Sequence, residues 1–149
     1  QPLSPDYPTT VLTDDYRLEC PAPSVRRGSR RYCTVMAIPE LTRRRAEKLL
    51  QRLIDRRLPP QFRDQIRMSV KVRGNDVVLF EHRPVWRMPD KWTNGKVARF
   101  QYNPTSERWT LFWSNRHGRW LRYEDKRPTT DIAALIGEVD RDPVGAFWG

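Results

Sequence analysis

The stretch IRMSVKVRGNDVVLF, residues 66–80, sets the fold class expected for this chain. Apolar and charged or polar residues alternate from Ile66 to Arg73, which is the period-two pattern of a half-buried β-strand. Gly74-Asn75 supplies a tight hairpin turn. Beyond Val77 apolar residues occupy both parities, as expected for a strand covered on both faces. The stretch therefore predicts two strands joined by a hairpin.

Further strands are predicted downstream of this hairpin. Alternating segments separated by short turns indicate three of them: residues 96–102, 108–114 and 119–123. Residues 84–95, which contain Trp86 and Trp92, are expected to form a loop. With the first two strands, this makes an antiparallel β-meander of about five strands.

Helical periodicity precedes the strands. After Pro39, with Thr42 as the expected N-cap, apolar residues recur at spacings of three and four until Pro59-Pro60 ends the helix. The residues on this face are Leu41, Ala46, Leu49, Leu50, Leu53 and Ile54. The opposite face is charged, as on an ordinary solvated helix.

A second helix is predicted near the C-terminus, capped by Thr130 and ended by Pro143. The aromatic pair Phe147-Trp148 beyond it is expected to fold back on the core. We therefore predict an α+β domain, in which an N-terminal and a C-terminal helix pack on one face of the meander.

Composition divides the chain into residues 1–35 and 36–149. The first segment is rich in proline, lacks apolar periodicity and contains both cysteines, Cys20 and Cys33. We expect it to be disordered or foreign to the native protein, with translation starting at Met36; a basic arm that contacts a partner is the alternative. The remainder is expected to be a single basic domain without disulfide, cofactor or membrane span, in the cytoplasm.

Charge is concentrated in that domain. Of the formal net charge of +10, residues 1–35 contribute five arginines against four acids, which leaves +9 for residues 36–149. An excess of this size attracts polyanions without specificity, mainly at low salt. Taken alone, it favours a solvated surface over a dedicated binding face.

Regular alternation would assign the strand residues to two faces. The first set is apolar and is expected to lie under the helices: Met68, Val70, Val72, Val78, Phe80, Ala98, Phe100, Tyr102, Trp109, Leu111, Trp113, Leu121 and Tyr123. The second set mixes cations with flat rings: Ser69, Lys71, Arg73, Val77, Leu79, Glu81, Arg83, Val97, Arg99, Gln101, Arg108, Thr110, Phe112, Trp120 and Arg122. A bulge in any strand would flip part of this assignment.

The second face has the composition of a platform for single-stranded nucleic acid, in which cations bind phosphates and planar groups stack on bases. The candidates are Lys71, Arg73, Arg99 and Arg122 for phosphates, and Phe112 and Trp120 for stacking. The structural alternative needs no ligand: long Arg and Lys stems cover half-exposed apolar side chains. Phe112 and Trp120 would then be satellite packing or a homodimer contact.

The string EHRPVW, Glu81 to Trp86, is the most distinctive local motif. Its structural interpretation is a Glu81–Arg83 ion pair with Trp86 stacked on the guanidinium. Its functional interpretation is that Arg83, with Arg99 opposite, binds an anion beside Trp86. Arg83 and Trp86 therefore join the candidate nucleic-acid-binding residues.

Few residues suit catalysis. Of two histidines, His117 is expected to be exposed in a hairpin turn, and His82 to be a satisfied buried residue on the core side. Four acids could in principle gather as the metal ligands of a nuclease, although their spacing matches no motif: Asp64, Asp76, Glu81 and Glu107. We predict no catalytic or metal-binding residue.

A set of motifs resembles the uncharacterised bacterial family called domain of unknown function 3024, over residues 36–149. The motifs are Glu81-x-Arg83-Pro84-x-Trp86, Val97-Ala98-Arg99-x-x-Tyr102, Trp109-x-Leu111-x-Trp113, Trp120-x-x-Tyr123 and Gly145-x-Phe147-x-Gly149. Arg99 stands where the family usually has lysine, which keeps the charge. The resemblance implies a small, bacterial, cytosolic stand-alone protein, and it lends no activity, cofactor or site.

From these observations we expect a non-enzymatic binding domain that engages nucleic acid, single-stranded rather than duplex, through its basic and aromatic sheet face. A homodimeric protein-interaction domain that uses the same face is the main alternative. A metal-dependent nuclease is the third.

Overall fold

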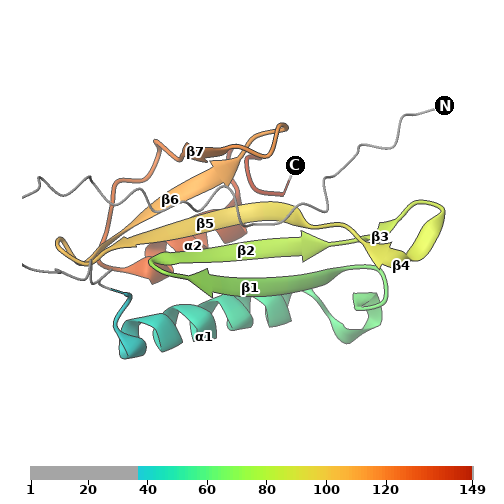
Figure 1. Ribbon diagram of the computed structural model, residues 1–149, viewed down its shortest axis with the longest axis horizontal. Helices are drawn as coiled ribbons and strands as arrows, with labels where there is room; N and C mark the ends of the chain where they lie inside the picture. Colours follow the sequence, from blue (N-terminus) through green and yellow to red (C-terminus); the bar gives the residue numbers. More distant parts are fainter. Residues whose placement is uncertain (1–36, 149) are drawn as a thin grey trace, which may run out of the picture. The chain divides into compact units, whose positions relative to one another are not determined.

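The computed structural model describes residues 37–148, so the expectations for residues 1–35 lie outside it. The elements, in chain order, are α1 (Glu40–Arg57), η1 (Pro60–Phe62), β1 (Arg67–Arg73), β2 (Asp76–His82), β3 (Pro84–Val85), β4 (Met88–Trp92), β5 (Gly95–Asn103), β6 (Arg108–Ser114), β7 (Trp120–Arg122) and α2 (Ile132–Arg141) (Figure 1). Five strands form one antiparallel sheet in the order β1-β2-β5-β6-β7, and β3 and β4 pair separately. The predicted α+β class and five-stranded antiparallel sheet are confirmed.

The Gly74-Asn75 turn sets the register of the sheet. Arg73 pairs with Asp76 across a two-residue turn, and Gly74 has a φ of 57°, as the first central residue of a type II′ turn requires. The same register places Val77 opposite Val72. Directly opposed residues in an antiparallel pair lie on the same face.

This register corrects the predicted assignment of β2. Val77 and Leu79 belong to the hydrophobic core cluster, although they were predicted on the outer side. Val78 and Phe80, predicted under the helices, lie on the opposite face, together with His82. The two-residue turn is the physical reason, because Val72 faces the core and its opposite partner must do the same.

A second correction concerns Val97 in β5. The pairing of β5 with β2 runs from Leu79–Ala98 to Phe80–Lys96, so one residue is skipped at Val97. Such a bulge leaves two neighbouring residues facing the same side. Val97 and Ala98 are both buried in the core cluster, whereas Lys96 is opposite Phe80 on the outer side.

One core cluster contains buried residues of both helices and of the sheet. Its helical members include Leu50 and Leu53 of α1 and Leu135 of α2, and Figure 1 shows α1 running alongside β1 and α2 behind β5. We call the sheet side that contributes to this cluster the core face: Met68, Val70, Val72, Val77, Leu79, Val97, Ala98, Phe100, Tyr102, Trp109, Leu111 and Trp113. Within residues 37–148, no helix is long and apolar enough to cross a membrane.

The N-cap of each helix differs from the predicted one, by three residues in α1 and by one residue in α2. Helix α1 starts at Glu40, with Pro39 rather than Thr42 at its N-cap position. Helix α2 is capped by Asp131, whose carboxylate accepts a hydrogen bond from the Ala133 backbone N–H at 3.1 Å. Thr130 lies one residue too early to reach this donor, since an N-cap oxygen bonds to the second or third N–H of the helix.

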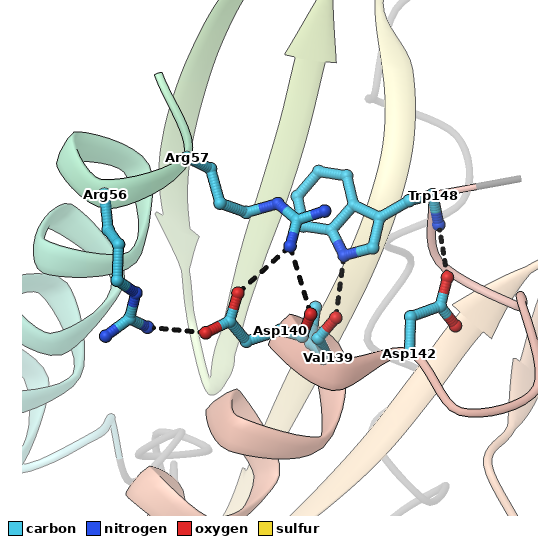
Figure 2. Close-up of polar contacts among 6 residues, drawn as sticks. All are labelled: Arg56, Arg57, Val139, Asp140, Asp142 and Trp148. Carbon is cyan, nitrogen blue, oxygen red and sulfur yellow. Dashed lines mark hydrogen bonds and ion pairs between the residues drawn. The ribbon is translucent and has the colours of Figure 1, made fainter. Parts of the chain in front are cut away.

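The C-terminal segment folds back on the core, as predicted. Asp142 ends α2 with a φ of 43°, and its carboxylate accepts hydrogen bonds from the backbone N–H groups of Ala146 at 2.7 Å and Trp148 at 3.0 Å. Phe147 is thereby buried in the core cluster. The Trp148 indole donates to the Val139 carbonyl at 2.7 Å (Figure 2).

Charged groups join the two helices beside this segment. Asp140 of α2 pairs with Arg56 at 2.7 Å and with Arg57 at 3.0 Å (Figure 2). The Arg57 guanidinium also lies 4.0 Å from the centre of the Trp148 ring. Both arginines are in the last turn of α1, so the end of that helix, α2 and the C-terminal segment are held together.

The corrected register of β2 makes a stability prediction. Leu79→Ala removes a fully buried side chain and should lower the free energy of unfolding by about 3 kcal/mol, measured by urea denaturation. Leu41→Ala makes the same truncation at a residue that is 81% exposed and should change it by less than about 0.5 kcal/mol. Equal effects of the two substitutions would contradict a core position for Leu79.

Candidate nucleic-acid interface

The side of the sheet opposite the core face is strongly basic. We call it the outer face, formed by alternate residues of all five strands: Arg67, Ser69, Lys71, Arg73, Asp76, Val78, Phe80, His82, Lys96, Arg99, Gln101, Asn103, Arg108, Thr110, Phe112, Ser114, Trp120 and Arg122. Seven of these residues are arginine or lysine and one, Asp76, is acidic, which gives a net charge of +6. Clustered like charges of this kind produce a positive potential that attracts anions.

The register brings six of the eight candidate residues onto the outer face: Lys71, Arg73, Arg99, Phe112, Trp120 and Arg122. The cations among them differ in exposure. Lys71, Arg73 and Arg122 are exposed, whereas Arg99 is partly buried. Arg67 and Lys96 also lie here and were not predicted, and Lys96 reaches this side through the bulge at Val97.

The rings of the outer face are in contact with the chain's own cations. The contacts, measured to the ring centre, are Lys71 to Phe80 at 5.3 Å, Arg99 to Phe112 at 5.1 Å and Lys96 to Trp120 at 5.5 Å. Each is within the distance at which a cation is attracted to an aromatic ring. A base could stack on Phe112 or Trp120 only where its cation moves aside or where the other side of the ring is open.

Arg99 is bound to Asp76. The two side chains are 3.0 Å apart and only 16% and 9% exposed. Burial raises the pKa of Asp76, and the hydrogen bond and charge of Arg99 oppose this, as does a hydrogen bond from Gln101. Arg99 therefore stabilises a buried carboxylate in addition to any contact with an external anion.

Arg83 and Trp86 lie away from these residues. Arg83 follows the end of β2, and its Nε is 2.6 Å from Glu81, so the predicted Glu81–Arg83 ion pair is confirmed. Arg99 is opposite Val78, near the start of β2, whereas Arg83 follows the end of that strand. The predicted juxtaposition of Arg83 and Arg99 is therefore wrong.

Residues 84–95 are not a plain loop, because β3 and β4 form a small hairpin there. Trp86 is in its turn and is 83% exposed, which is far too open for the predicted stack on Arg83. The ring that does meet a guanidinium in this region is Trp92, whose centre lies 3.9 Å from Arg67. Pro84 lies in β3 and Pro89 in β4, although proline is uncommon inside strands.

His82 lies on the outer face and not on the core side, as a consequence of the register of β2. Its Nδ1 is 2.9 Å from the Thr93 carbonyl, which can only accept, so this nitrogen donates. Its Nε2 is 2.7 Å from the Ser69 hydroxyl, so both ring nitrogens are bonded, as predicted. His117 is exposed in the turn between β6 and β7, also as predicted.

The four acids considered as metal ligands do not gather. Asp76 is paired with Arg99 and Glu81 with Arg83, at opposite ends of β2. Asp64 lies between η1 and β1, and Glu107 lies in the turn before β6. Across residues 37–148, no three His, Cys, Asp or Glu side chains are placed to hold a metal ion.

A second cluster of titratable groups lies on the core side. The Tyr123 hydroxyl donates to Glu138 at 3.1 Å, and Glu138 also pairs with Arg141 at 2.9 Å and Lys126 at 3.6 Å. Burial raises the pKa of Tyr123 to about 12, with a further contribution from Glu138. Burial acts to raise the pKa of Glu138 as well, but the hydrogen bonds from Arg141 and Tyr123 outweigh it and the pKa is lowered. All members are satisfied, so the cluster attaches α2 to the end of the sheet.

Comparison with known proteins gives one match. The model of the family described as "Domain of unknown function (DUF3024)" matches residues 38–149. No curated protein and no solved structure matches the chain. The matched range includes every element from α1 to α2.

The Arg99–Asp76 pair makes a pH-dependent prediction. Arg99→Ala leaves a buried carboxylate uncompensated and should lower the free energy of unfolding by about 3 kcal/mol at neutral pH, measured by urea denaturation. The pKa of Asp76, already raised in the folded protein, should rise further in the variant. The deficit should therefore shrink as the pH falls below neutral, because the carboxyl is then protonated and the buried charge is lost.

A double variant controls for the lost side chain. Adding Asp76→Asn to Arg99→Ala removes the buried charge and should recover much of the loss at neutral pH. A deficit that is independent of pH, and unchanged in the double variant, would show that the ion pair is not its cause.

The Tyr123–Glu138 bond makes a prediction at high pH. Tyrosine in the unfolded chain ionises near pH 10, whereas folded Tyr123 holds its proton to about pH 12. Ionisation of the unfolded state should therefore lower stability as the pH rises through this window. Tyr123→Phe should flatten the fall, as followed by urea denaturation at stepped pH. An equally steep fall in the variant would contradict the raised pKa.

Proposed function

The chain belongs to the DUF3024 family, whose description states no activity, and we propose that its outer face binds nucleic acid, single-stranded rather than duplex. The observation that supports this most directly is the excess of seven cations over one acid on one side of a sheet. Phosphate contacts by Lys and Arg supply most of the affinity in sequence-independent binding. The location that goes with this function is the bacterial cytoplasm, as the family resemblance implies.

The distribution of acids separates the outer face from the other basic surface of the domain. Helix α1 is also rich in arginine, but five of its seven cations have carboxylate partners: Arg43 and Arg44 pair with Glu40, Arg43 with Glu47, Arg45 with Asp131, and Arg56 and Arg57 with Asp140. Among the strand residues of the outer face, by contrast, seven are cations and one, Asp76, is an acid. A polyanion that approaches the strand residues of the outer face therefore meets fewer acidic side chains than one that approaches α1.

The shape of the surface favours single strands. The exposed cations Lys71, Arg73, Arg108 and Arg122 come from β1, β6 and β7, and so from both edges of the sheet. Four strand spacings of about 4.8 Å separate the edges by roughly 19 Å, enough for several nucleotides. A broad sheet does not enter a duplex groove as a helix or two-stranded ribbon does, whereas it suits an open strand.

The homodimer alternative is less well supported by the same surface. A two-fold contact would place a face of net charge +6 against its own copy. Like charges brought together across an interface oppose association. Static light scattering tests this alternative directly, and a stable dimer that dissociates in Trp120→Ala would favour it over nucleic-acid binding.

Paired charge deletions test the proposal. The outer-face variant Lys71→Ala with Arg122→Ala should weaken binding of a fluorescein-labelled oligo-dT about tenfold at low salt, measured by anisotropy. Loss of two phosphate contacts should also reduce the slope of log affinity against log salt by about 1.4. Because both side chains are exposed, folding should be unaffected.

A matched control removes the same charge from the exposed surface of α1. Lys48→Ala with Arg52→Ala should change the affinity less than about twofold, although the net charge falls equally. Absence of binding by the unmodified protein at low salt would refute the proposal. So would equal weakening by the two double variants, because the interaction would then depend on total charge alone.

A further inference from the structure

One aromatic side chain is much more exposed than the others. Two aromatic residues within 37–148 are exposed, Phe62 at 45% and Trp86 at 83%. Tryptophan has a large apolar surface and normally covers most of it inside a folded domain. A nearly bare indole in a domain with a filled core therefore suggests a contact outside the domain.

The backbone around Trp86 holds it at the tip of a projecting hairpin. Val85 pairs with Met88, so Trp86-Arg87 forms a two-residue turn between β3 and β4. Figure 1 shows this hairpin extending past the ends of β1 and β2. Arg87 has a φ of 69°, in the left-handed region that strains residues with a side chain and where a turn usually has glycine. Strain of this kind tends to occur at functional positions.

The base of the hairpin is attached to the outer face. The Trp92 ring lies under the Arg67 guanidinium at 3.9 Å, and the Thr93 carbonyl accepts from His82 Nδ1 at 2.9 Å. Arg67 and His82 both belong to the outer face. The Thr93 hydroxyl also accepts from the Arg83 backbone N–H at 3.1 Å. Trp86 is thus presented on an extension of the same surface that the proposed function uses.

The charges near Trp86 resemble those of the outer face. Residues 83–94 contain three cations, Arg83, Arg87 and Lys91, and one acid, Asp90. All four side chains are exposed. A flat ring flanked by cations matches a nucleotide, whose base can stack and whose phosphate is anionic.

Comparison with the sheet gives the ring at the tip a distinct role. Phe80, Phe112 and Trp120 each have a cation of the chain close to the ring, and none is exposed. We infer that the two parts divide the work: the outer-face cations bind phosphates, and Trp86 stacks on an unpaired base of the same strand. This inference rests on the proposed function, and it names an unpaired nucleobase as the ligand of the hairpin.

The test separates a flat ring from mere bulk. Trp86→Leu keeps an apolar side chain without a ring, Trp86→Phe keeps a ring, and Met88→Ala is a matched change at the neighbouring exposed apolar residue, 48% exposed. The probe is oligo-dT with one 2-aminopurine, whose fluorescence is quenched on stacking, and anisotropy of a labelled copy gives the affinity. Circular dichroism and thermal melting confirm that each variant is folded.

We expect Trp86→Leu to weaken binding of the oligonucleotide about tenfold. We also expect this variant to lose the quenching of 2-aminopurine fluorescence that the unmodified protein causes. Trp86→Phe should retain most of both, and Met88→Ala should match the unmodified protein. Unchanged affinity and quenching in Trp86→Leu would overturn the inference and leave the proposed function standing. Absence of oligonucleotide binding by the unmodified protein would overturn both.

An exposed tryptophan among cations could also meet an anionic lipid surface, and a second probe distinguishes this case. Vesicles of phosphatidylserine and phosphatidylcholine are tested by co-sedimentation with the same variants. Binding to vesicles that is lost in Trp86→Leu, together with unchanged binding of oligo-dT, would overturn the inference and assign the hairpin to a membrane. The converse result supports base stacking.

Discussion

The Gly74-Asn75 turn is the constraint on which the two sides of the sheet depend. A two-residue turn pairs Arg73 with Asp76 and Val72 with Val77, and each pair shares a face. Val77 and Leu79 are thereby directed into the core, and Asp76 is directed to the outer face, where it meets Arg99. A three-residue turn that included Arg73 would instead pair Val72 with Asp76. The two faces of β2 would then be exchanged, and the Asp76 carboxylate would lie on the apolar core face. The separation of the apolar core face from the basic outer face therefore depends on the geometry of one hairpin turn.

Much of the architecture was predictable because it depends on local pattern. Alternation in residues 66–73 and helical spacing in α1 and α2 are short-range signals, and both gave the correct element type. It was harder to predict which residues of β2 face the core, because apolar residues occupy both faces of this strand and alternation does not distinguish them. The turn contained the missing information, because its length of two residues determines that Val77 is opposite Val72 and lies on the same face of the sheet. The bulge at Val97 had no comparable signal, as it depends on how β5 packs against β2.

The candidate site shows the same division between local and distant information. The cations of β1 and β7 were predictable from alternation, and the register places them on the outer face. The pairing of Arg99 with Asp76 joins residues 23 positions apart and requires the register of two strands. The hairpin of β3 and β4 was missed because proline normally interrupts strands, and here both strands are short and lie outside the main sheet. Trp86 was singled out by its motif, but its exposure could be learned only from the structure.

Contacts between rings and cations limit what the outer face can do alone. A cation over Phe80, Phe112 or Trp120 shields the ring from water and holds the charge at the surface of the sheet. A second copy that approached this layer would bring the same charges, which oppose association across an interface. The layer also reduces the ring area available for stacking, so the nucleic-acid binding that we propose would be mainly electrostatic on the sheet and insensitive to sequence. A distinct aromatic contact then has to come from a ring outside this layer, and the described domain has such a ring at the tip of the β3–β4 hairpin.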